Sequence, residues 1–138
     1  MPSPELVAAI KGIVASARAG DLEAAYKGYR ALFSSSAFGS YEPQDQRQAL
    51  RLMVHAKGVP DPPTPAMVEA HRAALQSLVR LVKAHGEPAD HEMLGMCHVA
   101  TGDEKTAAEV FRVALSLERE RNAQSDLCGA LMKRVSML

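Results

Sequence analysis

Hydrophobic residues recur at three- and four-residue intervals along most of this 138-residue chain. That spacing places them on one face of an α-helix, because the helix turns once every ~3.6 residues. The first such stripe runs through Leu6, Val7, Ile10, Ile13, Val14 and Ala17. Comparable stripes follow in the segments around Tyr29, Leu50, Leu78, Phe111 and Leu131. The pattern predicts an all-helical protein.

Prolines and capping residues divide this pattern into separate helices. Proline suits the first helical turn, because the N–H that it lacks would have no partner there. Four prolines stand just ahead of an apolar stripe: Pro4, Pro43, Pro65 and Pro88. Ser3 and Thr64 are placed to cap two of these starts, and we expect Gly58 and Gly86 to end two helices. The predicted helices cover residues 3–19, 21–35, 43–57 and 64–85, two more lie within 87–120, and a last one covers 123–137.

Two segments of the chain share a spacing of small and aromatic residues. Gly20-Asp21 and Gly102-Asp103 each separate two predicted helices, and they lie 82 residues apart. Each is followed by an alanine and, four residues later, an aromatic residue: Ala25 and Tyr29 in the first segment, Ala107 and Phe111 in the second. Leu94-Gly95 precedes the second turn, whereas Gly12-Ile13 stands at the matching place before the first.

These motifs resemble the tetratricopeptide repeat, a helical hairpin of about 34 residues with the pattern W-x2-L-G-x2-Y, A-x3-F and a closing P. His91 and His98 stand where the family has its tryptophan and tyrosine, and Arg119 stands near the closing proline. The resemblance implies a single domain, 1–138, built as an α–α superhelix of three hairpins, 3–35, 43–85 and 87–120, with a closing helix over 123–137. The middle hairpin matches least, because a proline-rich linker, 60–63, enlarges it.

In this family the first helix of each hairpin lines a concave surface that receives a peptide. Carried across by spacing, the resemblance implies a groove lined by Val7, Ile10, Val14, Gln48, Leu52, His55, Glu92, Met96 and Val99. The Lys, Asn and Arg set with which some members hold a C-terminal carboxylate is missing. The expected ligand is therefore an apolar or amphipathic helix. The alternative is that the middle loop or the closing helix already fills some of these positions.

Composition narrows the classes of partner. Lys and Arg balance Asp and Glu at 16 each, and no basic run appears, so nucleic acid and anionic membranes are not expected partners. No apolar run approaches the ~18 residues of a membrane span, and the N-terminus lacks a signal-peptide pattern. Cys97 and Cys128 both lie in apolar helical patterns, where buried free thiols are expected. These features lead us to expect a cytoplasmic protein.

Candidate catalytic and metal-binding residues are few. His91 and His98 lie two turns apart near Cys97, but they lack the short paired spacings of zinc sites, so no metal and no other cofactor is expected. No nucleophile motif or phosphate loop appears. We therefore expect a non-enzymatic interaction module, an adaptor, scaffold or chaperone-like subunit that binds a protein segment. The alternative is a homodimer in which the closing helix pairs between subunits; an enzyme or metal protein is the third hypothesis.

Overall fold

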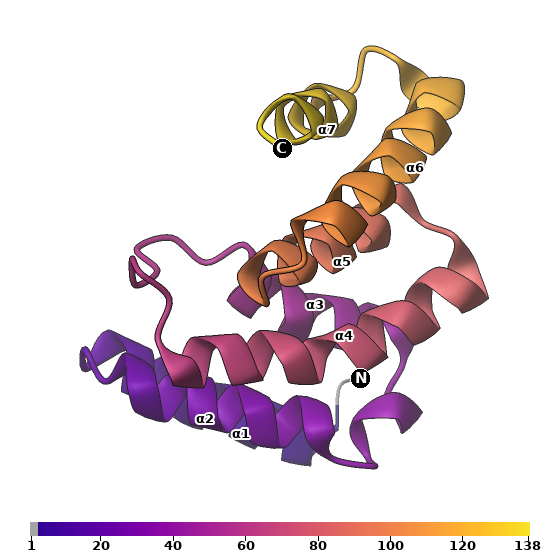
Figure 1. Ribbon diagram of the computed structural model, residues 1–138. Helices are drawn as coiled ribbons and strands as arrows, with labels where there is room; N and C mark the ends of the chain where they lie inside the picture. Colours follow the sequence, from indigo (N-terminus) through magenta and orange to yellow (C-terminus); the bar gives the residue numbers. More distant parts are fainter. Residues whose placement is uncertain (1–2) are drawn as a thin grey trace.

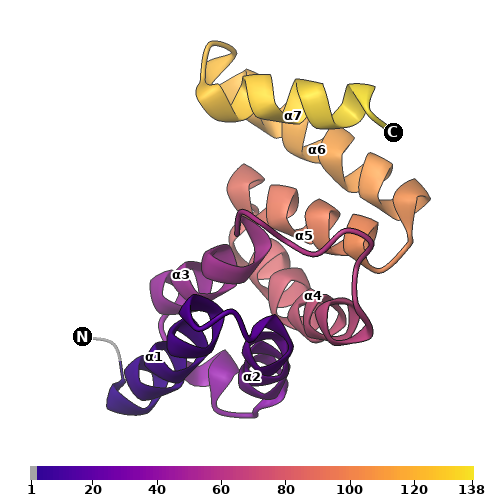
Figure 2. The same cartoon turned by 90° about the vertical axis from the view of Figure 1, so that its left-hand side faces the viewer.

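A computed structural model describes residues 3–138 (Figures 1 and 2). This part of the chain is all-helical, as the sequence predicts. Its elements are α1 (Pro4–Arg18), α2 (Leu22–Ser34), the 3-10 helix η1 (Phe38–Ser40), α3 (Pro43–Val54), α4 (Pro65–His85), α5 (Pro88–Ala100), α6 (Glu104–Asn122) and α7 (Asp126–Ser136). No helix among these residues has the length and apolar character needed to cross a membrane.

The predicted helix starts are confirmed at all four prolines, each of which occupies the first turn of its helix. Ser3 accepts a hydrogen bond from the Glu5 amide, and Thr64 accepts one from the Met67 amide, both at 3.2 Å. Gly86 ends α4 with a left-handed backbone, φ 63°.

Two predicted boundaries were wrong. α3 ends at Val54 rather than near Lys57, and Gly58, with φ 70°, lies in the turn that leads into the proline linker. α7 begins at Asp126, because Ser125 caps it: the Ser125 hydroxyl accepts a hydrogen bond from the Cys128 amide at 3.0 Å. His55 is the last capping residue of α3 and Ser125 the first of α7, and both lie inside the ranges that hydrophobic periodicity assigned to the helices.

The two Gly-Asp turns have the same backbone geometry. Gly20 and Gly102 adopt φ 83° and 88°, and the amide of the following aspartate bonds back to the carbonyl five residues earlier, at 2.9 and 2.8 Å. This bond belongs to the Schellman ending of a helix, which requires a left-handed residue and therefore favours glycine. Asp21 and Asp103 then cap the next helix, each accepting a backbone amide at 3.1 Å. The predicted turns at Gly20-Asp21 and Gly102-Asp103, each ending one helix and starting the next, are confirmed.

The helices form a stack with α1 and α2 at one end and α6 and α7 at the other (Figure 1). Sequential pairs pack closely, α1 on α2, α4 on α5, α5 on α6 and α6 on α7, and α2 also packs extensively on α4. α3 is the exception, because it approaches only α4 and α5 closely, and less than the other pairs do. The main core extends from Leu6 to Cys97, and a second cluster joins α6 to α7 around Phe111 and Leu131.

Each terminal hairpin depends on one glycine at a close helix crossing. In the α5/α6 hairpin a Cβ on Gly95 would overlap the ring of Phe111. In the α1/α2 hairpin the small residue lies on the second helix instead, because a Cβ on Gly28 would lie 2.7 Å from Ile13 Cγ1. Ile13 holds the place that matches Gly95, so the loss of the leucine–glycine pair in the first hairpin is offset by a glycine on the facing helix.

Because His71 is buried, we expect the protein to become less stable toward unfolding as the pH falls. His71 lies on α4 beside Tyr26, its Nδ1 is 2.8 Å from the Met67 carbonyl oxygen, and burial lowers its pKa below the ordinary 6.5. The unfolded chain then binds more protons than the folded one once the pH falls below about 6.5, so the free energy of unfolding decreases with acidification.

We expect His71→Leu to show a smaller decrease between neutral and mildly acidic pH, measured by urea unfolding at each pH. His85→Gln, at an exposed ring, is the control and should follow the wild type. Burial also lowers the pKa of His55, so this residue adds the same pH dependence to the free energy of unfolding in all three proteins. Equal slopes for the wild type and His71→Leu would contradict the prediction.

Candidate partner-binding groove

A groove separates α1 from α3, which do not pack closely against each other. It consists of two hollows that share Leu52, and we call the whole the α1/α3 groove. The first hollow, of about 290 Å³, is lined by Leu6, Val7, Ile10, Lys11, Asp45, Gln48, Ala49 and Leu52. The first turns of α1 therefore face the first turns of α3, and the two helices run in the same direction along the groove.

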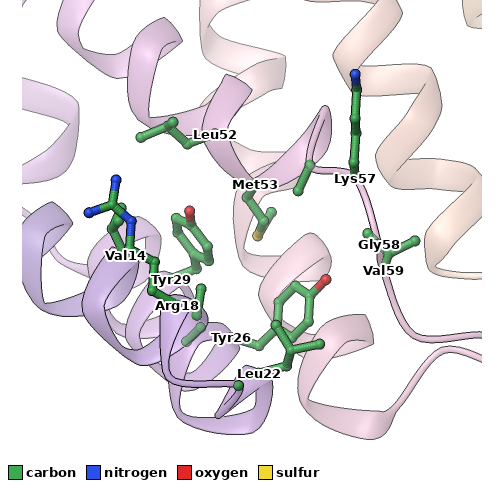
Figure 3. Close-up of a pocket in the computed structure, with 14 residues that line it drawn as sticks. Val14, Arg18, Leu22, Tyr26, Tyr29, Leu52, Met53, Lys57, Gly58 and Val59 are labelled. Atoms are coloured by element: carbon green, nitrogen blue, oxygen red, sulfur yellow. The ribbon is translucent and has the colours of Figure 1, made fainter.

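The second hollow, of about 510 Å³, lies between the last turns of α1 and α3 and reaches the start of the proline linker (Figure 3). Its apolar wall includes Val14, Leu22, Leu52, Met53 and Val59. Two aromatic side chains of α2, Tyr26 and Tyr29, form its floor. We call this hollow the tyrosine pocket.

Several large apolar side chains remain exposed along the groove. Leu52 is 45% exposed, Val7 is 37% exposed and Val59 is 42% exposed. Leu52 lines both hollows, so it forms the ridge between them. Exposed apolar side chains are ordinary when scattered, but a concave arrangement along one groove is typical of interaction sites.

The structure brings together the predicted groove residues of α1 and α3 up to Leu52. Val7, Ile10, Gln48 and Leu52 line the first hollow, and Val14 lines the tyrosine pocket with Leu52. These positions come from separate helices that the repeat spacing placed on one surface.

The remaining predicted groove residues line neither hollow. Glu92 is buried between α3 and α7: its Oε2 accepts a hydrogen bond from Arg134 Nε at 2.8 Å, and its Oε1 lies 3.6 Å from His55 Nε2. Met96 is partly buried between the two core clusters, and Val99 is exposed on α5. The closing helix, α7, therefore already covers Glu92, as the alternative interpretation of the groove expected for some positions.

The floor of the tyrosine pocket holds two phenol groups without protein partners. Tyr26 and Tyr29 are only 5% and 8% exposed, and within residues 3–138 neither hydroxyl makes a hydrogen bond. Burial raises the pKa of both, and for Tyr29 the neighbouring Tyr26 adds to the rise. Both are therefore neutral hydrogen-bond donors at physiological pH. In Figure 3 the Tyr29 hydroxyl points toward Leu52 and the Tyr26 hydroxyl toward Gly58 and Val59.

Sequence reasoning missed the polar part of this pocket. The sequence predicts hairpin packing for Tyr29; its buried ring stacks on Phe33 of the same helix, at 5.7 Å between centroids. Arg18 and Lys57 fall at the ends of predicted helices, yet both line the pocket. No local signal identifies them, because the pocket depends on where α3 lies relative to the first hairpin.

The two cysteines are buried, and the His91 ring contacts the backbone of its own helix. Cys97 and Cys128 are free and buried, as predicted, and burial raises the pKa of Cys97 to about 12. His91 Nδ1 lies 2.9 Å from the Glu87 carbonyl oxygen. Among residues 3–138, His, Cys, Asp and Glu side chains do not gather in a group of three that could hold a metal ion.

Comparison of the chain with protein-family models, with curated proteins and with solved structures gives no significant match.

Proposed function

We propose that this protein is a non-enzymatic interaction module that binds an amphipathic helix of a partner protein in the α1/α3 groove. The observation that carries the proposal is the row of exposed apolar side chains along a concave surface, with Leu52 at its centre. A helix lying between α1 and α3 would present anchors at i, i+3 or i+4, and i+7 to the two hollows. Such a module would act as an adaptor, scaffold or chaperone-like subunit.

The proposal includes a tetratricopeptide-like arrangement of the helices. Three observations support it: the two equivalent Gly-Asp turns, the close contact of Gly95 with Phe111, and a closing helix packed on α6. In such an arrangement α1, α3 and α5 are the leading helices of three hairpins, and the groove lies on the surface that they share.

Apolar burial would supply most of the affinity. Removing apolar surface from water contributes roughly 25 cal/mol per Å², but association and the ordering of side chains offset much of this gain. The groove does not extend to α5, where Arg134 of α7 already pairs with Glu92. Reversible binding of moderate affinity follows, which suits an adaptor.

We expect Ile10→Glu and Leu52→Glu to weaken partner binding by at least about tenfold, because each would place a carboxylate in a desolvated apolar contact. Binding is measured by fluorescence anisotropy with helical peptides selected by display on the wild-type protein. Val113→Glu, at an exposed valine of α6 outside the groove, is the matched control and should bind as the wild type does.

Thermal unfolding of each variant shows whether weaker binding comes from a changed binding surface or from unfolding of the protein. Leu52 is exposed, so its replacement should leave the melting temperature nearly unchanged. Folded variants at Ile10 and Leu52 that bind the selected peptides as tightly as the wild type would refute the groove assignment.

Self-association through α7 is the second candidate, and one observation favours it: Met132, Met137 and Leu138 are exposed near the C-terminal end of the chain. Light scattering across micromolar concentrations distinguishes the two. A dimer that Met132→Glu converts to a monomer supports the second candidate; a monomer at all concentrations removes it.

A further inference from the structure

The tyrosine pocket differs from the rest of the groove in its polar groups. Its charged lining residues are Arg18 and Lys57, both cations, and neither forms an ion pair within residues 3–138. Tyr26 and Tyr29 are largely buried side chains, and their hydroxyls, which keep contact with solvent, add two groups that can donate hydrogen bonds. The first hollow, by contrast, has one cation and one carboxylate, Lys11 and Asp45.

An occupant of this pocket would have to satisfy those hydroxyls. In the free protein both hydroxyl oxygens remain accessible to water, but an occupant that covered them without offering a partner would leave them unfavourably unpaired. A purely apolar anchor would expel that water and leave the hydroxyls unpaired. An anchor that carries acceptor oxygens would replace the water instead, and a negative charge would pair with Arg18.

We infer that the tyrosine pocket receives an acidic side chain of the partner helix, whose carboxylate accepts a hydrogen bond from Tyr29 and pairs with Arg18 while its stem contacts Val14 and Leu52. The inference rests on the proposed function, and it adds charge selectivity to an otherwise apolar groove. Arg18 and Tyr29 are the specificity-determining residues. In Figure 3 the Arg18 side chain and the Tyr29 hydroxyl lie on the same side of the pocket, toward α1.

The register of the bound helix follows from the spacing of the two hollows. Ile10 lines the first hollow and Arg18 the second, eight residues apart on α1, which corresponds to about 12 Å along the helix axis. A partner helix aligned with the groove would therefore carry its acidic residue about two turns from the apolar residue that contacts Ile10.

A displayed library tests this inference. Its members are helical peptides about as long as α1, with apolar residues fixed at i, i+3 and i+7 and the other positions randomised. The baits are the full chain as wild type, Arg18→Gln and Tyr29→Phe; the phenylalanine keeps the ring that stacks on Phe33 and removes only the hydroxyl. Arg30→Gln, at an exposed arginine of α2, and Tyr41→Phe, which line neither hollow, are matched controls.

We expect the wild type and both control variants to enrich Asp or Glu about two turns from an apolar anchor, and Arg18→Gln to lose that enrichment. A selected peptide, synthesised with an amidated C-terminus, should lose about tenfold in affinity when its acidic residue becomes Gln. This ratio should shrink toward one with Arg18→Gln and with Tyr29→Phe. Restoring a free C-terminal carboxylate on the Gln peptide tests whether a chain terminus can replace the acidic side chain.

Three results would overturn the inference, and they differ in what they leave standing. Selected peptides that depend on Leu52 but show no acidic enrichment would refute the acidic anchor and leave the groove intact. Recovery of affinity by the free C-terminus alone would assign the pocket to a terminal carboxylate. A selection that yields no peptide sensitive to Leu52→Glu would refute the groove and the anchor together.

Discussion

We expect Asp90→Ala to lower the free energy of unfolding by about 3–5 kcal/mol, because it removes one partner of a buried ion pair. Asp90 lies in the first turn of α5 and is 1% exposed. Arg47 of α3, whose side chain is 16% exposed, donates from Nε to both carboxylate oxygens at 3.0 Å, and its Nη2 lies 3.0 Å from Oδ2. Without Asp90, the guanidinium of Arg47 would remain buried and uncompensated.

The matched control is Glu87→Ala, three residues away at the start of the same helix. Glu87 pairs with Arg121 of α6 at 2.8 Å, but these side chains are 39% and 55% exposed, and such solvent-exposed pairs contribute little. Both carboxylates lie near the N-terminus of α5, so their interaction with the helix dipole is similar. Chemical denaturation measures the difference, and equal small losses for Asp90→Ala and Glu87→Ala would contradict the assignment.

This ion pair has a consequence for function. α3 packs less closely on its neighbours than the other helices do, and Arg47 is its principal polar link to α5. Because α3 forms one wall of the α1/α3 groove, we expect folded Arg47 or Asp90 variants to bind groove peptides more weakly, although neither residue lines the groove.

The second large effect is expected at Gly95. Replacing glycine by alanine inside a helix ordinarily stabilises it by up to ~1 kcal/mol, through backbone entropy. At Gly95 the new Cβ would overlap the Phe111 ring, so we expect Gly95→Ala to lower the free energy of unfolding by about 1–3 kcal/mol. The sign of the change is therefore opposite to the one that helix propensity predicts.

Two helical glycines serve as controls. A Cβ at Gly12 in α1 or at Gly129 in α7 would meet no packed neighbour within 4 Å, so alanine should be neutral or stabilising at both. Phe111→Leu combined with Gly95→Ala should recover part of the loss, because the smaller side chain makes room for the Cβ. Gly95→Ala as stable as Gly129→Ala would show that the α5/α6 crossing does not depend on this contact.

Local sequence signals were sufficient to locate the α-helices and most of their ends. Prolines at four starts, serine and threonine caps, and glycines that adopt left-handed backbone all act on residues within a few positions, so each can be recognised without the rest of the chain. The repeat spacing also placed Val7, Ile10, Val14, Gln48 and Leu52 along one groove.

Packing between residues far apart in the sequence decided which charges are buried, where helices touch and where the pocket lies. Glu92 looks like a surface residue in the sequence, but Arg134, 42 positions later, covers it. Gly28 lies inside α2, where glycine ordinarily weakens a helix, but Ile13 of α1 occupies the space beside it. The donor-lined floor beneath Leu52 exists only because α3 stands away from the first hairpin. Helices form from short-range preferences, whereas pockets and buried charges depend on which distant surfaces meet, and no local pattern records that choice.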